Sequence, residues 1–410
     1  MPDIDTDFCI VGSGPAGMTL ALLLLRSGAR VAVVERSPSL RREYRGEVIQ
    51  PGGLAVLDQL GVLSGARERG AWEHSRFQLV EGDRPLLDVD YRALPAPYNC
   101  LLSLPQQHLL AEMLEACRRY EGFTDLSGHR VEGLLRSAAG VRGAEVGGAG
   151  GRGEIRAHCV IGADGRHSKV RRLAGIRNRR FDLFDLDVLW FKIPSGPEPP
   201  SSVRIYRGRG NPVLAYGSYP DGVQLGWTLP HRGYRAAAEQ GIDHVKRQIR
   251  TTVPGYADAI DAHLASLSDL TLLDVFAAGA ERWSVPGLVL LGDSAHTLSP
   301  LGSQGINLAL QDAALLHPVL MRALRAPDQA VSLLREYERA RRRDIVAVMR
   351  IQRIQSRSML SVGGIGARVF PRIARILGRT PLQHRMTRRI AFGNRPVRVA
   401  SELFVADQRK

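Results

Sequence analysis

The chain has 410 residues, 44% of them hydrophobic, so it can bury large cores and should divide into about two or three structural units. The net charge is +15, but the basic residues are mostly arginines spread along the chain; we expect a solvated surface and no nucleic-acid partner. The four cysteines form no CxxC pair, which argues against a metal site and for reduced thiols in a cytoplasmic protein. Apolar runs near the N-terminus fall short of the roughly 20 residues that span a bilayer, so we expect no membrane span.

The chain begins with a strand, a glycine turn and a helix. Residues 8–11 form a short apolar run without polar alternation, typical of a parallel strand covered on both faces. Three glycines in the GxGxxG spacing follow, and residues 18–26 have a helical, leucine-rich pattern. A second apolar strand is predicted at residues 31–34. We interpret the whole segment as one right-handed βαβ unit.

The glycine turn has the chemistry of a dinucleotide site. Gly12 permits the tight turn, Gly14 lets the backbone approach a pyrophosphate, and Gly17 lets helix and strand pack closely. The helix N-terminus offers free N–H groups and the positive end of its dipole to the phosphates. Glu35, about twenty residues further on, is placed to accept hydrogen bonds from the adenosine ribose and to repel a 2′-phosphate. The site should therefore prefer FAD or NAD over NADP; the alternative for Glu35 is an ordinary surface position.

The predicted secondary structure of the rest of the chain changes twice. Strands dominate its middle, and helix–strand alternation returns later, which predicts a mainly antiparallel sheet inserted into a nucleotide-binding domain. In chain order, we predict a hairpin at residues 77–80 and 86–91, a helix at 105–120, strands at 131–135, 141–146, 154–161, 187–193, 203–206, 213–219 and 223–229, a helix at 244–252, a strand at 288–291 and a long helix at 305–325.

A second GxGxxG match lies at residues 148–153. The residues after it, 154–161, predict a strand, and no helix opens there. Because a dinucleotide turn must lead into a helix, we interpret this match as a hairpin turn. The candidate for a second dinucleotide domain is thereby removed.

Three segments together resemble the signatures of the single-component flavin monooxygenases related to p-hydroxybenzoate hydroxylase. They are the glycine turn, the Gly-Ala-Asp-Gly of residues 162–165, and Gly292-Asp293 with the Pro-Leu-Gly-Ser-Gln-Gly-Ile-Asn of residues 300–307. The resemblance covers about residues 5–325, and residues 45–51 and 105–106 also resemble flavin-contacting segments of this group. Together with the glycine turn, it gives a predicted FAD site made of Gly12, Gly14, Pro15, Ala16, Gly17, Glu35, Arg36, Arg45, Gln106, Asp164, Gly165, Gly292, Asp293, Pro300, Gly302, Gly305, Ile306 and Asn307.

Each predicted flavin contact has a simpler alternative. Asp293 is placed to accept hydrogen bonds from the flavin ribityl hydroxyls, as the family's Asp does; the alternative is helix N-capping. The N–H groups of residues 302–307 can stabilise the charge that develops at flavin N1 and O2 on reduction, and Pro300 would stiffen that loop. For Asp164 the alternative is an ordinary Asp-Gly turn. For Gln106 it is a capping box at the start of a helix.

We predict an α/β protein with a Rossmann-like FAD-binding domain around a parallel sheet, an inserted, largely antiparallel β domain for the substrate, and a C-terminal helical extension. The FAD-binding domain is discontinuous in sequence. We assign residues 1–72, 99–180 and 272–330 to the FAD-binding domain, 73–98 and 181–271 to the substrate domain, and 331–410 to the helical region.

The resemblance implies a hydroxylase. NADH or NADPH would reduce the flavin transiently, dioxygen would form a C4a-hydroperoxide, and its distal oxygen would pass to an electron-rich, aromatic or polycyclic small molecule. No acid or base is assigned, because His108 and His296 lack a partner in the sequence. In this family one face of the inserted sheet covers the active site, although strand aromatics are more often core. The substrate candidates are Trp190, Tyr206, Tyr216 and Trp227.

Two alternatives remain. A related flavoprotein could reduce or oxidise a lipid-like substrate without oxygen insertion, and its basic C-terminal helices could then make weak peripheral contact with a membrane. Otherwise the arginine cluster at residues 339–343 marks the solvated face of a helix. A nucleotide- or nucleic-acid-binding protein without enzymatic activity is supported by charge alone. The sequence leaves the oligomeric state open.

Overall fold

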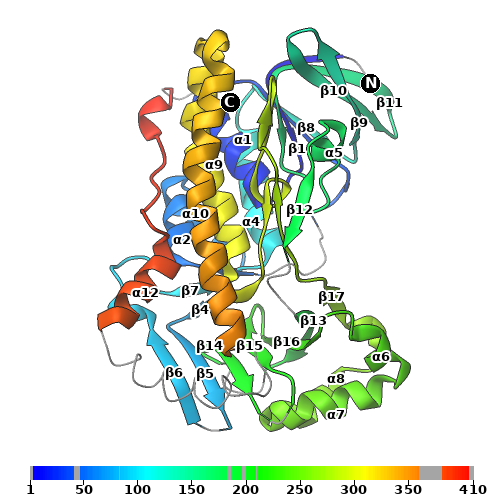
Figure 1. Cartoon of the computed structure of the whole chain (residues 1–410), viewed down its shortest axis with the longest axis vertical. Coiled ribbons are helices and arrows are strands. Elements are labelled where there is room, and N and C mark those ends of the chain that lie inside the picture. The colour runs from blue at the N-terminus through cyan, green and yellow to red at the C-terminus, as the bar shows by residue number, and fades with distance from the viewer. Residues whose placement is uncertain are drawn as a thin grey trace.

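The computed structural model describes residues 3–40, 47–82, 84–181, 186–195, 200–208, 210–359 and 381–405. Two large sheets lie toward opposite ends of an elongated molecule (Figure 1). Helix α9 (Gln304–Arg325) packs on α1 (Pro15–Arg26) beside the first sheet, and α10 (Ala330–Met359) packs on α9 and reaches the second sheet. The mixed α/β class with C-terminal helices is as predicted.

The first sheet has eight strands and a parallel centre. Its order is β19-β20-β11-β1-β2-β8, with β10 paired to β11 and β9 paired to β10. The pairs β20·β11, β11·β1, β1·β2 and β2·β8 are parallel, so the carboxyl ends of these strands meet at one edge. The strands are β1 (Ile4–Val11), β2 (Val31–Glu35), β8 (Phe123–Ser127), β9 (Arg130–Ser137), β10 (Gly140–Gly148), β11 (Gly151–Gly162), β19 (Ser284–Val285) and β20 (Leu288–Leu290).

The second GxGxxG match is the turn between β10 and β11. The two strands are antiparallel neighbours, and Gly148 pairs with Gly151 across the turn. No helix begins there, so the prediction of a hairpin is confirmed.

Helix α1 (Pro15–Arg26) is buried on every side. Its residues 16–25 are all buried, because the helix packs between the parallel sheet and helices α4 (Gln106–Arg118) and α9. This position explains a leucine-rich sequence with no polar face. The shorter helices of this region are α2 (Pro51–Gln59), α3 (Leu63–Glu68) and α5 (Lys169–Leu173).

The second sheet has seven strands in the order β17-β13-β16-β15-β14-β5-β6, and only β14 and β5 pair in parallel. Helices on one of its faces enclose an apolar core. The strands are β5 (Arg76–Glu81), β6 (Arg84–Asp90), β13 (Leu186–Pro194), β14 (Ser202–Arg207), β15 (Val213–Ser218), β16 (Gly222–Pro230) and β17 (Thr271–Leu273), and the helices are α6 (Tyr234–Glu239), α7 (Ile242–Thr252) and α8 (Ala257–His263).

Two three-stranded sheets complete the strand inventory of the described residues. The first, β3-β7-β4, contains β3 (Val48–Ile49), β4 (Trp72–His74) and β7 (Leu101–Ser103), and the second, β12-β18-β21, contains β12 (Asn178–Phe181), β18 (Ala277–Ala280) and β21 (His296–Thr297). Short 3-10 turns are η1 (Tyr91–Ala93), η2 (Pro254–Tyr256), η3 (Leu267–Asp269), η4 (Gly292–Ser294), η5 (Leu301–Ser303), η6 (Pro327–Gln329) and η7 (Ser401–Leu403).

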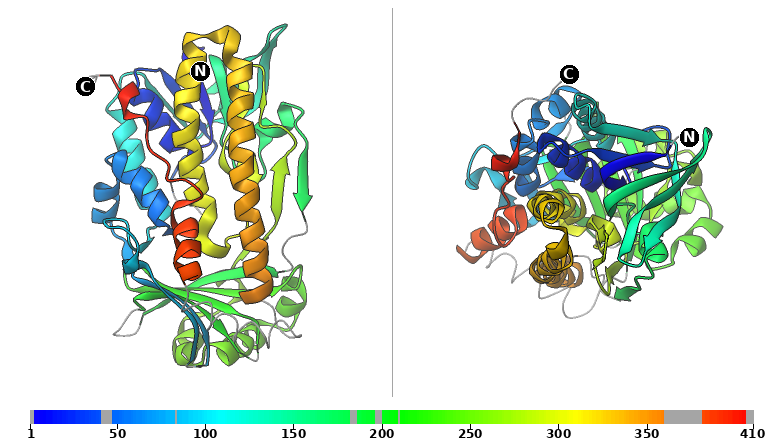
Figure 2. Two further views of the ribbon diagram at one scale, coloured as in Figure 1. Left: turned by 60° about the vertical axis from the view of Figure 1, so that its left-hand side comes forward. Right: turned by 90° about the horizontal axis from the view of Figure 1, so that it is seen from above.

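The C-terminal segment returns along the first sheet's helices. Helix α12 (Pro381–Phe392) packs on α2, and the extended chain after it runs back toward α1 (Figure 2). The Val399 N–H donates to Gln59 Oε1, and the Val405 N–H donates to the Arg26 carbonyl. These contacts tie the chain's last described residues to its first helices.

All four cysteines, Cys9, Cys100, Cys117 and Cys159, are buried and free. Burial raises the pKa of Cys9 to about 12 and that of Cys100 to about 11, so these thiols stay protonated at neutral pH. Among the described helices, none has both the length and the apolar composition needed to cross a membrane.

Candidate functional site

The glycine turn leaves no room for a side chain at Gly12 or Gly17. Gly12 has a φ of +107°, and a Cβ there would lie 2.4 Å from the Ala163 carbonyl oxygen of the neighbouring segment. A Cβ on Gly17 would lie 2.0 Å from the Gly12 carbonyl oxygen. Gly14 is the N-cap of α1 and supplies no side-chain cap, so the first N–H groups of the helix remain available to phosphate oxygens. This turn fits a pyrophosphate.

The Glu35 carboxylate lies directly beside this turn. Its Oε2 accepts hydrogen bonds from the Ser13 N–H at 3.0 Å and the Ser13 hydroxyl at 3.1 Å, and its Oε1 accepts the Ser37 N–H at 3.0 Å. A carboxylate has about four acceptor positions, so ribose hydroxyls can still be accommodated. Glu35 is therefore not an ordinary surface residue. Arg36 is exposed, and Arg45 lies outside the described residues.

The Asp164 carboxylate is engaged with its own chain. Its Oδ2 accepts the N–H groups of Lys169 at 2.6 Å and Val170 at 3.0 Å, and its Oδ1 accepts the hydroxyls of Ser168 and Ser294. Gly165 has a φ of +80°, and its N–H donates to the Ser294 hydroxyl at 3.1 Å. Asp164 thus caps α5 and joins the end of β11 to η4, which favours a structural role over direct cofactor contact.

Asp293 lies in η4, beside the glycine turn. A Cβ on Gly292 would lie 3.3 Å from the Cβ of Ala16 at the start of α1, so the first and third signatures meet here. The Asp293 side chain caps no helix; Leu291 is the N-cap of η4. Among the described residues, the Arg166 guanidinium, 3.8 Å away, is the partner of the Asp293 carboxylate. Asp293 thus remains available for ribityl hydroxyls, and the capping alternative is wrong.

The loop after β21 opens α9, as predicted. Gly302 and Ser303 have φ values of +72° and +53°, and α9 starts at Gln304. A Cβ on Gly305 would meet no atom within 4 Å, so the first turn of the helix is open on that side. Ile306 is half-buried in this turn, and the buried Asn307 side chain accepts the Gln50 N–H at 2.8 Å.

Gln106 is the first residue of α4, with Pro105 as the N-cap and no side-chain cap. Among the described residues, the Ser103 hydroxyl has no hydrogen-bond partner, so the capping-box alternative for Gln106 is wrong. The flavin role of Gln106 stays a prediction.

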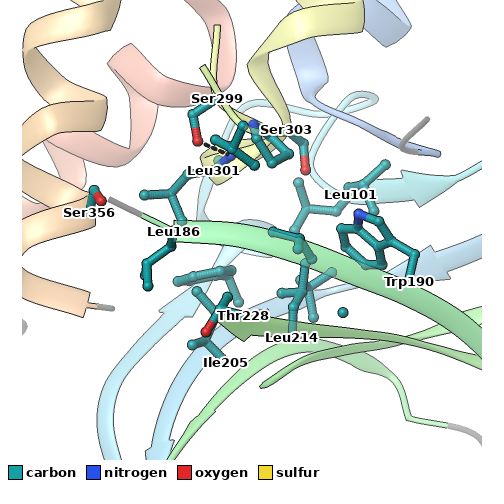
Figure 3. Close-up of a pocket in the computed structure, with 18 of the residues that line it drawn as sticks. Leu101, Leu186, Trp190, Ile205, Leu214, Thr228, Ser299, Leu301, Ser303 and Ser356 are labelled. Atoms are coloured by element: carbon teal, nitrogen blue, oxygen red, sulfur yellow. Dashed lines mark hydrogen bonds between the residues drawn. The ribbon is translucent and has the colours of Figure 1, made fainter. Parts of the chain in front are cut away.

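A pocket lies between the second sheet and the Pro300–Ser303 part of the loop (Figure 3). It contains about 810 Å³ of space that is partly open to solvent. The ring of Trp190 lies over Gly226, where a Cβ would come within 2.6 Å of the ring. The Thr228 hydroxyl donates to the Pro212 carbonyl, so the floor of the pocket is essentially apolar. The lining residues are Val48, Gln50, Phe77, Leu101, Leu186, Val188, Trp190, Val203, Ile205, Leu214, Gly226, Thr228, Val275, Ser299, Pro300, Leu301, Gly302, Ser303 and Ser356.

Of the four aromatic substrate candidates, only Trp190 lines the pocket. Trp227 follows Gly226 and precedes Thr228, so strand alternation turns it to the opposite face, where it is 2% exposed in the core beneath α7. Tyr206 also packs against this core. Tyr216 is buried behind Trp190, 6.3 Å from it between ring centroids. The prediction is therefore wrong for Tyr206 and Trp227, and Tyr216 supports the wall without lining it.

The structure also gives His296 the partner that the sequence did not reveal. Its Nε2 lies 2.7 Å from Asp312 Oδ2, and the Arg341 guanidinium donates to Asp312 Oδ1 at 2.6 Å. Burial alone would raise the pKa of Asp312, but the adjacent His296 and Arg341 hold it below its usual value. Arg341 is 4% exposed, which corrects the expectation that the whole cluster at 339–343 is solvated. The distribution of charges along a sequence cannot identify a buried arginine unless the carboxylate that pairs with it is known.

His108 donates from Nδ1 to the Gly70 carbonyl oxygen at 2.8 Å, and its ring makes a T-shaped contact with the ring of Tyr219. Neither His108 nor His296 lines the pocket. No acid or base is therefore assigned from the described residues.

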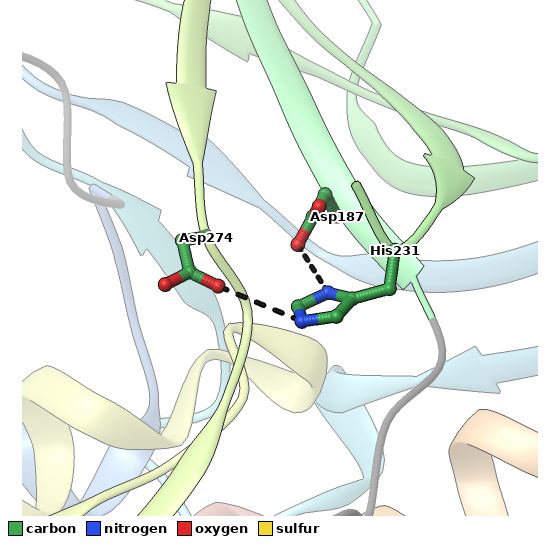
Figure 4. Close-up of side chains that lie close together, drawn as sticks. All are labelled: Asp187, His231 and Asp274. Atoms are coloured by element: carbon green, nitrogen blue, oxygen red, sulfur yellow. Dashed lines mark hydrogen bonds and ion pairs between the residues drawn. The ribbon is translucent and has the colours of Figure 1, made fainter. Parts of the chain in front are cut away.

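Asp187, His231 and Asp274 gather near the pocket, beside Leu186 and Val275 (Figure 4). The buried Asp187 carboxylate accepts His231 Nδ1–H at 2.8 Å and the N–H groups of Arg232 and Val275 at 2.9 and 3.1 Å. These hydrogen bonds satisfy Asp187 without a metal ion. We infer that the cluster holds together the ends of the neighbouring strands β17, β13 and β16.

The comparisons with known proteins agree with this geometry. A family profile described as FAD binding domain matches residues 5–352. The 6-methylpretetramide 4-monooxygenase of Streptomyces rimosus is 56% identical, over 97% of this chain and 95% of its own. The protoasukamycin 4-monooxygenase of Streptomyces nodosus subsp. asukaensis is 26% identical, over 85% and 87%. A crystal structure of P. aeruginosa PqsL in complex with 2-aminobenzoylacetate has a TM-score of 0.76 at 25% identity, covering 87% of this chain and 96% of that one. The chain belongs to the FAD-dependent monooxygenases related to p-hydroxybenzoate hydroxylase.

Proposed function

We propose that this enzyme is an NAD(P)H-dependent hydroxylase of a planar polycyclic aromatic compound, and that 6-methylpretetramide is the first substrate to test. The observation that carries the proposal is the 56% identity to a 6-methylpretetramide 4-monooxygenase over 97% of the chain. The apolar pocket beside the Pro300–Gly302 loop is consistent with it.

The pocket's chemistry favours flat, apolar rings with polar groups along one edge. Val188, Trp190 and Leu214 offer apolar surface on the sheet, and stacking on an aromatic ring adds about 0.5–1.5 kcal/mol to the burial of such rings. Gln50, Thr228 and Ser356 also line the pocket, and Ser299 and Ser303 place two hydroxyl groups on the loop. A phenolic edge directed at the loop would satisfy them and orient the ring carbon to be hydroxylated.

The described residues fit FAD in an extended form. Bound FAD would supply the redox chemistry: it would accept hydride from the nicotinamide, activate dioxygen and deliver one oxygen atom. The N-terminus of α1 would hold the pyrophosphate, Glu35 the adenosine ribose, and Asp293 the ribityl chain. The N–H groups at the start of α9 would stabilise negative charge at the pyrimidine end of the flavin. Asp164 would position η4 rather than contact the cofactor.

We also propose that the two sheets belong to separate units with the boundaries predicted from the sequence. Residues 73–98 would join 181–271 in the substrate unit, consistent with the pairing of β5 and β14. Because only one glycine turn leads into a helix, the nicotinamide would bind transiently elsewhere and leave after hydride transfer. The choice between NADH and NADPH stays open to measurement.

The test is oxygen labelling. The purified protein, loaded with FAD, is mixed with NADH or NADPH, 6-methylpretetramide and labelled dioxygen. We expect a product that carries one labelled oxygen atom, and a substrate-dependent increase in the rate of flavin reduction. Product without label, or reduction of the substrate without added oxygen, would overturn hydroxylation and favour the non-oxygenating alternative.

A further inference from the structure

Three glutamine amides hold the loop at residues 299–302, which lines the pocket. Gln50, the N-cap of α2, donates from Nε2 to the Gly302 carbonyl at 3.0 Å. Gln304, at the start of α9, donates to the same carbonyl at 3.0 Å and to the Ile390 carbonyl on α12. Gln352, on α10, is the third. Helices distant in sequence therefore converge on one short loop.

Gln352 makes two of these hydrogen bonds. Its Nε2 lies 2.9 Å from the Ser299 carbonyl oxygen and 2.7 Å from the Leu301 carbonyl oxygen, and the side chain is 1% exposed. Carbonyl oxygens only accept, so the amide nitrogen must face them, which fixes the orientation of the side chain. Its Oε1 has no hydrogen-bond partner in the part of the chain that the structure describes. No other amide orientation keeps both bonds.

This clamp also sets the direction of the loop's N–H groups. In a trans peptide the carbonyl and the following N–H point in opposite directions. With the Leu301 carbonyl directed at Gln352, the Gly302 N–H points away from the Gln352 amide, and Gly302 itself lines the pocket. Gly302 has a φ of +72°, a conformation that favours glycine and lets the chain turn there.

We propose that Gln352 is a positioning residue for the flavin: it aims the Gly302 N–H at the pyrimidine end of the isoalloxazine and so stabilises the reduced cofactor. The inference rests on the proposed function in requiring FAD beside this loop. It gives the long C-terminal helix α10 a role in setting the redox chemistry of a site that lies mainly on other elements.

Gln352→Met tests the proposal, because it keeps the length and volume of the side chain and removes both donors. We expect the midpoint potential of bound FAD to become more negative. Losing one oriented donor should change the ratio of reduced to oxidised FAD roughly tenfold, which is about 30 mV for a two-electron couple. The affinity for oxidised FAD should change less, since the ADP end is held elsewhere.

Gln383→Met is the matched control. Gln383 also donates from Nε2 to a backbone carbonyl, that of Asp88 at 3.3 Å, but it ties α12 to β6 away from the loop. The midpoint potential of FAD bound to Gln383→Met should equal that of FAD bound to the wild type. Should Gln352→Met give no soluble protein, Gln352→Asn, which keeps an amide one methylene shorter, should shift the potential in the same direction by a smaller amount.

Equal potentials in the Gln352 variants, Gln383→Met and wild type would overturn the positioning role, even in an enzyme that hydroxylates 6-methylpretetramide. A shifted potential in a protein that leaves 6-methylpretetramide and related phenols unoxygenated would support the positioning role and reject the proposed hydroxylation. The two proposals therefore fail separately.

Discussion

The glycine turn and the pocket illustrate two ways in which a sequence encodes a site. At the turn, chemistry comes from the main chain: an added Cβ would lie 2.0 Å from the Gly12 carbonyl at position 17 and 2.4 Å from the Ala163 carbonyl at position 12. In the pocket, chemistry comes from apolar side chains such as Val188 and Leu214, which other apolar residues could replace. The first kind of site restricts residue identity at fixed spacing; the second restricts only position in a sheet.

Gly17→Ala should therefore have the largest effect on FAD binding. One methyl group would force α1 away from the turn, at a cost of about 1–3 kcal/mol in folding free energy, and would close the site to the pyrophosphate. We expect purified protein without FAD, measured by its flavin absorbance. Gly150→Ala, in the hairpin that mimics the motif, meets no atom within 4 Å and should retain FAD. Equal flavin content in the two variants would contradict the choice of turn.

The same contrast explains how far the sequence predicts the structure. The sequence predicted the βαβ unit, the hairpin at the second GxGxxG match and the inserted sheet. These were predictable because the hydrophobic period and the spacing of glycines reflect backbone geometry. The place of Glu35 beside the turn also followed from its position at the end of a strand, while its role toward the ribose stays a prediction. Which strand aromatics face the pocket did not follow, since alternation gives two faces but does not say which one the loop covers. Trp190 and Trp227 are a clear example.

Contacts between distant helices were beyond the sequence for another reason. Gln352 and Arg341 lie in a basic helix whose pattern indicates an exposed face, yet both are buried by their partners, the loop carbonyls and Asp312. A polar residue can be buried when it is hydrogen-bonded, and those partners are known only once the helices are placed. Residue type and periodicity alone therefore assign such positions to solvent.

The two faces of the second sheet allow a closer test of how side chains define the pocket. Trp227→Ala should cost about 3–5 kcal/mol of folding free energy, because it removes a large side chain from the closed core under α7. Trp190→Ala should cost less, because its ring borders a pocket, but it should change the ratio of kcat/KM values for substrates with different numbers of rings. Urea unfolding and paired kinetics measure the two effects. A change of selectivity in Trp227→Ala alone would reverse the assignment of the faces.

A buried histidine on α9 and one beside the second sheet should both lower the stability of the fold at acidic pH. Burial lowers the pKa of His317, on α9, and of His74, beside the second sheet, to about 4. Because the unfolded pKa is about 6.5, the unfolded chain binds more protons below that pH, and stability falls as the pH drops from 6.5 toward 4. The loss is on the order of 3 kcal/mol per histidine at pH 4. His317→Gln, which can keep a hydrogen bond to Ser27, should flatten this slope in unfolding curves; an unchanged slope would refute the assignment.

A smaller effect on FAD binding than that of Gly17→Ala is expected at Glu35, where side-chain chemistry supplements the main-chain site. Glu35→Ala should remove charge-assisted ribose hydrogen bonds worth about 1.5–3 kcal/mol, which weakens FAD binding roughly ten- to a hundredfold in a titration of the apoprotein. Because Glu35 also accepts from Ser13, part of the loss could come from a displaced turn. Ser13→Ala separates the two causes, since it removes one hydrogen bond to Glu35 and leaves the carboxylate in place. If Ser13→Ala weakens FAD binding as much as Glu35→Ala does, the carboxylate aligns the turn and does not hold the ribose.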